Sequence, residues 1–297
     1  MTRTKILLTG ANGQVGWELQ RTLSNLGEVV ALDSQALDLA DGTSLRNKLR
    51  EIAPQMIVNA AAYTAVDKAE NDVDRAHAIN TVAPGIFAEV AAQSGALLVH
   101  YSTDYVFDGS GTTPWREEDA CSPLNVYGET KLAGERLIQA SGCRHFIFRT
   151  SWVYGARGSN FLLTMRRLMR ERSELKIVAD QMGAPTWCRD LAEATSQIIS
   201  QLVASCGDQK VAPLGIYHMS NAGETSWHGF AQAIQALDIE SGTLSSARLI
   251  AIPGSEYPTP AQRPLNSRLD NSKLERIFGL RLQDWRAALA MCMKDSL

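Results

Sequence analysis

KILLTGANGQVGWEL, residues 5–19, is the stretch that decides the fold. Its first five residues form an apolar run that fits a buried β-strand, and Val15, Leu19 and Leu23 follow at helical spacing. Three glycines separate the two elements: Gly10, Gly13 and Gly16. Glycines at this point let the backbone turn tightly and approach a pyrophosphate, whose charge the helix N-terminus then meets. The stretch therefore predicts a strand, a turn and a helix that bind a dinucleotide.

An acidic residue ends the next predicted strand, residues 28–33. Asp33 stands 17 residues after Gly16, where a carboxylate can accept hydrogen bonds from the adenosine ribose hydroxyls of a dinucleotide. Ser34 and Gln35 follow it, and no arginine stands beside it to hold a 2′-phosphate. This favours NADH, or the use of both NADH and NADPH.

Apolar runs and helical patterns alternate through the first half of the chain. Strands are expected at residues 28–33, 55–59, 96–102 and 144–149, and helices around residues 45–52, 79–92 and 125–140. This alternation predicts an α/β fold of the Rossmann type, a doubly wound parallel sheet. Beyond about residue 155 the rhythm weakens, and a strand near Ile216 and a proline-rich stretch at residues 253–264 suggest a smaller lobe. We expect a dinucleotide-binding domain at residues 1–155 and a mainly substrate-binding lobe at residues 156–297, some of whose segments return to the first domain.

Composition limits the classes of function. The 297 residues are 45% hydrophobic and 21% charged, as in soluble globular proteins, and the net charge of −3 gives no reason to expect nucleic acid as a partner. No apolar run is long enough to span a membrane, and the N-terminal residues read as a strand rather than a signal peptide. Five scattered cysteines without a Cys-x-x-Cys motif fit reduced thiols in a cytoplasmic protein, and the histidines lack metal-ligand spacing.

Tyr127 and Lys131 are four residues apart in the predicted helix at residues 125–140 and therefore share one of its faces. An ammonium group near a phenol favours the phenolate, which would bring the pKa of Tyr127 towards neutral pH and make it a proton donor. A hydroxyl at the end of the preceding strand would hold the substrate oxygen. Ser102 and Thr103 are both candidates, and only one of them can face the cleft because strand side chains alternate.

These residues resemble those of a known family. The G-x-x-G-x-x-G spacing is characteristic of the short-chain dehydrogenase/reductase superfamily, and its combination with Thr103, Tyr127 and Lys131 resembles the extended members that act on nucleotide sugars. Longer strings resemble the dTDP-4-dehydrorhamnose reductase family across nearly the whole chain. They are VNAAAYTAVDKAE at 58–70, HYSTDYVFDG at 100–109, RTSWVYG at 149–155, GAPT at 183–186 and RPLNSRLD at 263–270.

The resemblance implies a set of site residues. Thr103 becomes the third catalytic member beside Tyr127 and Lys131. The implied cofactor contacts are Gly10, Gly13, Gln14, Val15, Gly16, Asp33, Asp38, Leu39, Ala62, Tyr63, Thr64 and Lys131. The implied substrate contacts are Thr103, Asp104, Tyr105, Tyr127 and Trp152. Arg263, in the proline-rich loop, is a further candidate that could hold the substrate's diphosphate through two parallel hydrogen bonds.

The reaction implied is the NADPH- or NADH-dependent reduction of the C4 keto group of a dTDP-linked 6-deoxy-4-keto-hexose, the last step of dTDP-L-rhamnose synthesis for cell-surface polysaccharide. Tyr127 would protonate the C4 oxygen. Nucleotide-sugar dehydratases carry Asp-Glu after the threonine, whereas this chain has Asp104 and Tyr105, which disfavours elimination of water. Two alternatives stay open: another nucleotide-sugar reductase or epimerase, and a non-catalytic dinucleotide-binding subunit like the regulatory subunit of methionine adenosyltransferase.

The resemblance also suggests a bound metal ion and an oligomeric state. Some family members are described as homodimers linked by a magnesium ion on glutamates, and Glu18 matches one such position. Arg189 stands where another ligand would be expected, and a cation beside a metal is unfavourable. We therefore expect no metal for the redox step, with Glu18 as the one Mg²⁺ candidate and a homodimer as a possible state.

Overall fold

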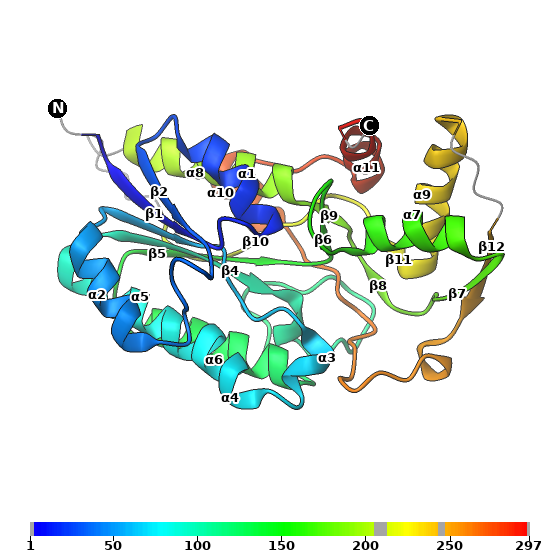
Figure 1. The fold of residues 1–297 in the computed structure, drawn as a ribbon, viewed down its shortest axis with the longest axis horizontal. Coiled ribbons are helices and arrows are strands. Elements are labelled where there is room, and N and C mark those ends of the chain that lie inside the picture. Colours follow the sequence, from blue (N-terminus) through cyan, green and yellow to red (C-terminus); the bar gives the residue numbers. More distant parts are fainter. Residues whose placement is uncertain (1–2, 205–212, 243–246, 296–297) are drawn as a thin grey trace.

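A six-stranded parallel sheet forms the centre of the molecule in the computed structural model, which describes residues 3–204, 213–242 and 247–295 (Figure 1). Its strands run in the order β10-β5-β4-β3-β1-β2. Their bounds are β1 Lys5–Thr9, β2 Glu28–Leu32, β3 Met56–Asn59, β4 Leu97–Thr103, β5 His145–Thr150 and β10 Gly215–His218. Since β2 and β3 pair with opposite edges of β1, the chain changes direction across the sheet there. In open α/β sheets such a switch point opens a crevice at the carboxyl ends of the strands.

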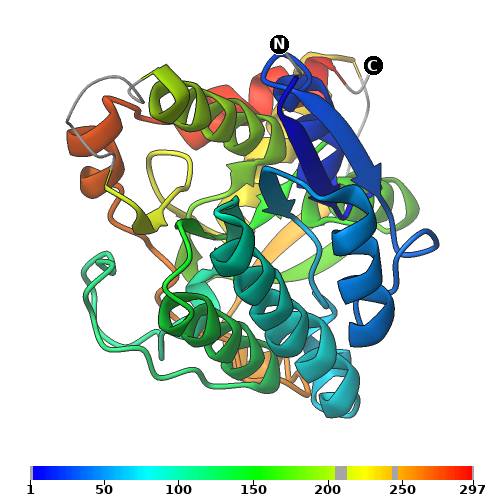
Figure 2. The same cartoon turned by 90° about the vertical axis from the view of Figure 1, so that its left-hand side faces the viewer.

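Two apolar layers cover the sheet, and strand alternation decides which side chain joins which layer. Leu8, Val58 and Val99 pack with α1 (Gln14–Leu23) and α8 (Cys188–Ala204) on one face. On the other face, Leu7 and Ile57 pack with helices α2 (Gly42–Ile52), α5 (Ala83–Ser94) and α6 (Val126–Ala140). Figure 2 shows α5 and α6 side by side on their face of the sheet. The prediction of a doubly wound Rossmann-type sheet is confirmed.

The helix expected at residues 79–92 has a different local structure. A π-helical turn, Ala78–Val82, connects α4 (Val73–His77) to α5. Pro84 has no N–H to donate to the carbonyl of Asn80, and a missing donor of this kind is a usual cause of such a bulge. The turn leaves the Asn80 side chain free to accept from the backbone N–H of Tyr63 at 2.8 Å. It therefore braces the loop after β3, which carries predicted cofactor contacts.

The second half of the chain builds a smaller layer of short strand pairs against helices (Figure 1, right). A third apolar cluster joins α7 (Phe161–Glu171), α9 (Trp227–Glu240) and α11 (Trp285–Lys294). The short strands pair as β7 (Glu174–Val178) with β12 (Arg248–Ile252), β8 (Met182–Gly183) with β11 (Thr225–Ser226), and β6 (Val153–Tyr154) with β9 (Thr186–Trp187).

Three segments of this half return to the central sheet. The strand expected near Ile216 in the smaller lobe is β10, which pairs with β5, and both α8 and α10 (Ser272–Phe278) pack on the sheet's first apolar layer. The remaining short helix, α3 (Val66–Ala69), follows β3. Over the described ranges, no helix has both the length and the apolar character to cross a membrane.

Candidate active site

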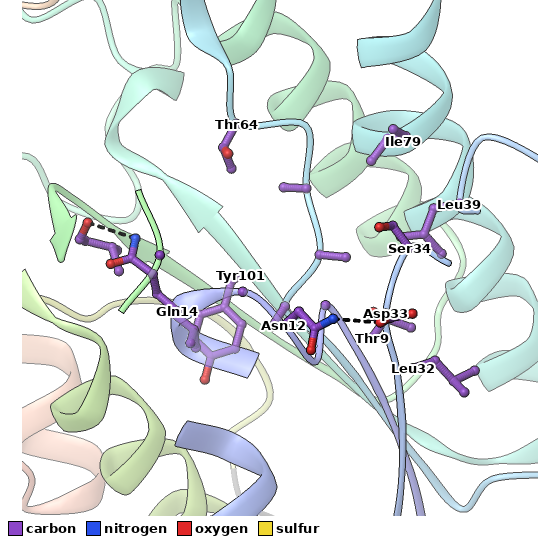
Figure 3. A pocket seen from close by; sticks show the side chains of 18 of the residues that line it. Thr9, Asn12, Gln14, Leu32, Asp33, Ser34, Leu39, Thr64, Ile79 and Tyr101 are labelled. Atoms are coloured by element: carbon purple, nitrogen blue, oxygen red, sulfur yellow. Dashed lines mark hydrogen bonds between the residues drawn. The ribbon is translucent and has the colours of Figure 1, made fainter. Parts of the chain in front are cut away.

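A cavity of about 530 Å³ lies at the carboxyl ends of β1, β3 and β4, where the sheet changes direction (Figure 3). Most of the predicted cofactor residues line it. They are Gly10, Gly13, Gln14, Val15, Asp33, Asp38, Leu39, Ala62, Thr64 and Lys131, and Tyr127 joins them. The residues come from loops and helices that are distant in sequence, and the order of the strands brings them together.

The glycine loop has the close backbone contacts that exclude larger residues. Gly10 has φ +77°, and a Cβ there would lie 2.8 Å from the backbone nitrogen of Ala61. Gly16 does not line the cavity; it lies in α1, where a Cβ would come within 2.0 Å of the Gly10 carbonyl oxygen. Gly13, at the N-terminal boundary of α1, supplies no side-chain cap, so the first N–H groups of the helix remain available to an anion. The loop therefore fits the pyrophosphate of a dinucleotide.

Asp33 lies at the opposite end of the cavity from the Tyr127 region. Its carboxylate accepts from Asn12 Nδ2 at 2.6 Å (Figure 3) and from the backbone N–H groups of Gln35 and Ala36 at 3.0 and 2.9 Å. The hydrogen bond from Ala36 contributes most to lowering the pKa of Asp33 below its ordinary value. Asp33 is thus held as a carboxylate, the form that accepts from ribose hydroxyls.

Arg75 is a pocket residue that the sequence did not indicate. It comes from α4, more than 40 residues after Asp33, and its guanidinium lies 3.3 Å from Asp38 on the cavity wall. No arginine stands beside Asp33 in the sequence, but the fold brings Arg75 to the same cavity. Arginine is suited to bind a phosphate through paired N–H groups.

Tyr63 differs from its neighbours Ala62 and Thr64, because it is not among the cavity-lining residues. Its hydroxyl donates to Asp72 at 2.9 Å, and its backbone N–H donates to Asn80. The tyrosine side chain therefore fixes the loop after β3, while its neighbours face the cavity.

Tyr127 lies in the first turn of α6, close to Thr103 and Tyr105. The N-cap of this helix is Asn125, whose side chain accepts from the Gly128 N–H at 2.9 Å. Because Gly128 has no Cβ, the helix approaches the Tyr105 carbonyl; a Cβ would lie 2.2 Å from that oxygen. The rings of Tyr105 and Tyr127 meet edge to face, 5.6 Å apart. This approach places the Tyr127 phenol at the junction between the cavity and the Thr103 region.

The pKa of Tyr127 differs from the sequence-based expectation. Burial raises it to about 12, a side-chain hydrogen bond with Thr103 lowers it, and the Asp104 carboxylate raises it. The Lys131 amino group, which was expected to lower this pKa, has other partners. Its Nζ donates to the backbone oxygen of Tyr101 at 2.6 Å and lies 3.2 Å from His100 Nε2. Desolvation thus outweighs the expected effect of the lysine in this structure, and Tyr127 is a protonated phenol at neutral pH.

Ser102 and Thr103 face different surroundings at the end of β4. Ser102 lines the cavity, and its Oγ is buried without a hydrogen-bond partner in the described part of the chain. Thr103 turns towards Tyr127 and donates to Asp104 Oδ1 at 3.1 Å. Strand alternation therefore gives the two hydroxyls separate positions, one on the dinucleotide cavity and one beside the tyrosine.

Asp104 is fully buried next to these hydroxyls. Desolvation raises its pKa to about 7, against the lowering effect of hydrogen bonds with Ser267 and Thr103. Its Oδ2 is buried with no hydrogen-bond partner among the residues that the structure describes. Burial likewise raises the pKa of the neighbouring Tyr105. The carboxyl group can exist in either protonation state near neutral pH.

Trp152 and Arg263 lie outside the cavity-lining set, and both are held by other side chains. Trp152 has a positive φ of 47°, which is strained for a bulky residue, and its ring stacks on Trp227 with centroids 3.6 Å apart. Arg263 donates to Asp67 Oδ2 at 2.7 Å, and its charge lowers the pKa of Tyr105. Arg263 is therefore close to the Tyr105 end of the site.

The charged side chains around Glu18 do not suit a metal ion. Its carboxylate accepts from Arg189 Nε at 3.2 Å, and Arg21 lies 3.9 Å away. In the described ranges, no group of three or more histidine, cysteine or acidic side chains could hold a metal ion. Arg189 thus neutralises Glu18 directly, as its charge suggested.

Comparisons with known proteins show the family of the chain. Residues 4–297 match the model of the family described as RmlD substrate binding domain. A protein of Burkholderia thailandensis named dTDP-4-dehydrorhamnose reductase is 48% identical over 296 residues, which cover 99% of each chain. The crystal structure of such a reductase from Clostridium acetobutylicum superposes with a TM-score of 0.88 at 37% identity, covering 98% of this chain and 99% of the other.

A second solved structure comes with a bound cofactor. It is a dTDP-4-dehydrorhamnose reductase from Bacillus anthracis in complex with NADP, with a TM-score of 0.87 at 34% identity, and the match covers 99% of this chain and all of that one. The chain described here therefore belongs to the RmlD family of dTDP-4-dehydrorhamnose reductases.

Proposed function

We propose that this protein reduces the C4 keto group of dTDP-4-dehydro-L-rhamnose with NADPH or NADH, giving dTDP-L-rhamnose. One observation carries the proposal: Tyr127 and Lys131 both line a glycine-lined cavity, and Thr103 lies beside Tyr127, in a chain of this family. We place the enzyme in the cytoplasm and assign residues 1–155 to the dinucleotide and residues 156–297 mainly to the sugar nucleotide. A homodimer is the proposed assembly, without a metal on Glu18.

The cofactor assignment rests on both ends of the cavity. The α1 N-terminus and its glycines fit the pyrophosphate, and Asp33 is a carboxylate that suits the ribose hydroxyls of NADH. Arg75 adds a cation on the Asp38 side of the wall, where a 2′-phosphate would follow the adenosine ribose. We infer that the site accepts NADPH as well as NADH.

The proposed chemistry follows from the groups at the Tyr127 end. Reduced nicotinamide, when bound, supplies the hydride. Tyr127 gives its phenolic proton to the C4 oxygen, and its raised pKa keeps that proton in place until the oxygen becomes basic. The Thr103 hydroxyl, which lies beside Tyr127 and donates to Asp104 Oδ1 in the free site, turns its proton to the same oxygen when substrate is bound, and Lys131 lines the cavity. No further acid is required.

The alternative activities fit less well. A dehydratase would need a second carboxylate after Asp104, and the Tyr105 hydroxyl in that place has a raised pKa and is a poor base at neutral pH. A binding subunit would have no use for the phenol and the lysine that line the cavity, or for the Thr103 hydroxyl beside that phenol. Another reductase or epimerase of nucleotide sugars remains the second candidate because the same groups would serve it.

The test is turnover of the keto-sugar nucleotide, followed by the loss of reduced-nicotinamide absorbance and by identification of the sugar product. Conversion to dTDP-L-rhamnose is expected. Consumption of cofactor with a different C4 product would support the second candidate, and binding of cofactor without turnover of any such sugar would leave only a binding function.

Tyr127→Phe is the variant that tests the proton donor. It removes one hydroxyl from a half-buried ring, so we expect kcat to fall by about two to four orders of magnitude while NADPH affinity changes little. Binding is measured by calorimetry in parallel with turnover. A variant that keeps wild-type kcat would exclude Tyr127 from proton transfer.

A further inference from the structure

A buried chain of polar side chains lies behind Lys131 and is not used in the chemistry above. It runs from Thr9 at the end of β1, through Asn59 at the end of β3, to His100 within β4 and then to Lys131 on α6. Asn59 and Lys131 are almost inaccessible to solvent, as is His100. The separations are 2.7 Å from Thr9 Oγ1 to Asn59 Oδ1, 3.0 Å from Asn59 Nδ2 to His100 Nδ1, and 3.2 Å from His100 Nε2 to Lys131 Nζ.

The orientation of the Asn59 amide is determined by its other neighbours. Its Oδ1 accepts from the Thr9 hydroxyl and from the Ala61 backbone N–H at 3.2 Å, and a backbone N–H can only donate. The Asn59 NH₂ group must therefore face His100, so Nδ1 of that ring has to accept. A neutral imidazole that accepts at Nδ1 carries its proton at Nε2.

This tautomer directs an N–H towards the lysine. An ammonium group has no lone pair to accept it, whereas an uncharged amine accepts from His100 Nε2 and still donates to the Tyr101 carbonyl. We propose that Asn59 and His100 act as positioning residues that hold Lys131 as an uncharged amine in the cofactor-free protein, and that Lys131 takes up one proton from solvent when the dinucleotide binds.

The charged and titratable neighbours agree with this assignment. Burial lowers the pKa of Lys131 to about 8, so about half of this amine is uncharged at pH 8. Glu135, four residues later on α6, raises this pKa only in part. Glu135 is already paired with Arg149 at 2.6 Å. Burial keeps the pKa of His100 well below its ordinary value, so the ring stays neutral. Tyr127, one turn earlier, is uncharged at the same pH.

Dinucleotide binding favours the charged form of Lys131 over the uncharged form. Lys131 lines the cavity, and a bound dinucleotide brings ribose oxygens that accept hydrogen bonds and a diphosphate with negative charge. Both favour the ammonium form, with the proton drawn from solvent. The positive charge that eases loss of the Tyr127 proton is then fully present in the loaded enzyme. This inference rests on the proposed use of NADPH or NADH.

Proton uptake can be measured directly. NADPH is titrated into the protein by calorimetry at pH 8 in two buffers with different ionisation enthalpies, which gives both the affinity and the number of protons bound. The wild type is expected to take up a measurable fraction of a proton. Asn59→Asp should turn the His100 proton to Nδ1, and His100→Gln can present a carbonyl oxygen to Lys131; each should reduce uptake by about half or more.

The two variants separate this role from simple structural damage. His100→Gln adds no charge. If proton uptake falls in this variant as well as in Asn59→Asp, the decrease cannot come from a new carboxylate alone. His145→Gln is the matched control, because His145 opens β5 at the far end of the sheet, and it should match the wild type.

Each outcome has a definite meaning. Wild-type protein that binds NADPH without proton uptake, or uptake unchanged in both folded variants, would overturn the inference. Failure of the wild type to bind NADPH would instead contradict the proposed function. Reduced affinity with unchanged proton uptake would show that His100 and Asn59 only support the fold.

Discussion

Asp104 is the single residue whose environment has the clearest consequence for stability. Its folded-state pKa is raised by desolvation to about 7, above the ordinary value for an aspartate. Between roughly pH 4 and 7 the unfolded chain has lost this proton and the folded protein retains it, so stability falls as pH rises through this window. Above pH 7 the full penalty of a buried carboxylate is present.

Asp104→Asn should therefore stabilise the cofactor-free protein at pH 8, by up to about 4 kcal/mol, and have little effect near pH 4. Thermal unfolding at both pH values measures this. Asp108→Asn is the control, because the Ser110 N–H lowers the pKa of Asp108 and the stability that it contributes is lost as pH falls. Equal effects of Asp104→Asn at both pH values would contradict the pKa assignment.

Arg75 is the residue expected to distinguish the two cofactors. If its guanidinium meets the 2′-phosphate, Arg75→Ala should raise the KM for NADPH by about tenfold and leave the KM for NADH nearly unchanged. Steady-state kinetics with each cofactor provide the measurement. Arg46→Ala, which removes a comparably exposed arginine paired with Glu89 on the outer helices, should change neither. Equal losses with both cofactors would assign Arg75 to the loop structure instead.

At the scale of elements, the contact between the glycine loop and α1 depends on a missing side chain. A Cβ on Gly16 would lie 2.0 Å from the Gly10 carbonyl oxygen, which is backbone and cannot rotate away. Gly16→Ala should therefore displace the loop and weaken NADPH binding by about tenfold or more. Gly42→Ala, in the first turn of α2, meets only the Ile86 Cδ1 at 3.0 Å and should bind like the wild type. Calorimetric titration of both variants tests the difference.

The elements that sequence reasoning predicted are those whose signal is local. The apolar run and glycines of residues 5–19 specify β1, the turn and the start of α1 through nearest neighbours, and the predicted strands differ from the observed ones by about one residue. The π-helical turn before Pro84 was missed although the sequence carries a signal for it, because Pro84 lies inside the helix predicted at residues 79–92, where a proline removes an N–H donor. Nothing local to Ile216 indicates that β10 joins the central sheet, since this depends on the exposed edge of β5.

The residues of the site also divide into those with a local signal in the sequence and those without one. The Tyr127 and Lys131 pair is visible in sequence because one helix carries both, and the resemblance supplied Thr103. Arg75, Asn59 and His100 were not predicted, since each reaches the site from a different element and gains its role from the neighbours that the sheet order provides. The pKa of Tyr127 also depends on burial, which spacing does not reveal.

At the scale of the whole molecule, the loop before α10 contacts the first half of the chain, and one of these contacts is the ion pair between Arg263 and Asp67. Arg263 donates to Asp67 on α3, and the Ala261 N–H donates to the same carboxylate at 3.2 Å. Asp67 thus holds the loop, whereas Arg263 retains N–H groups that can meet a diphosphate near Tyr105.

The two partners of this ion pair should therefore respond differently to substitution. We expect Arg263→Ala to raise the KM for the sugar nucleotide by about tenfold or more, with NADPH affinity unchanged, because a paired contact to the diphosphate is lost. Asp67→Asn keeps Arg263 and one acceptor for the Ala261 N–H, so the KM of this variant for the sugar nucleotide should rise less than that of Arg263→Ala. Loss of the carboxylate also releases Arg263 to bind the diphosphate, which offsets part of the rise in KM. Steady-state kinetics for the sugar, with calorimetry for NADPH, measure both variants. Equal increases in KM would mean that the ion pair acts only by joining the loop to α3, and that the substrate's diphosphate is bound elsewhere.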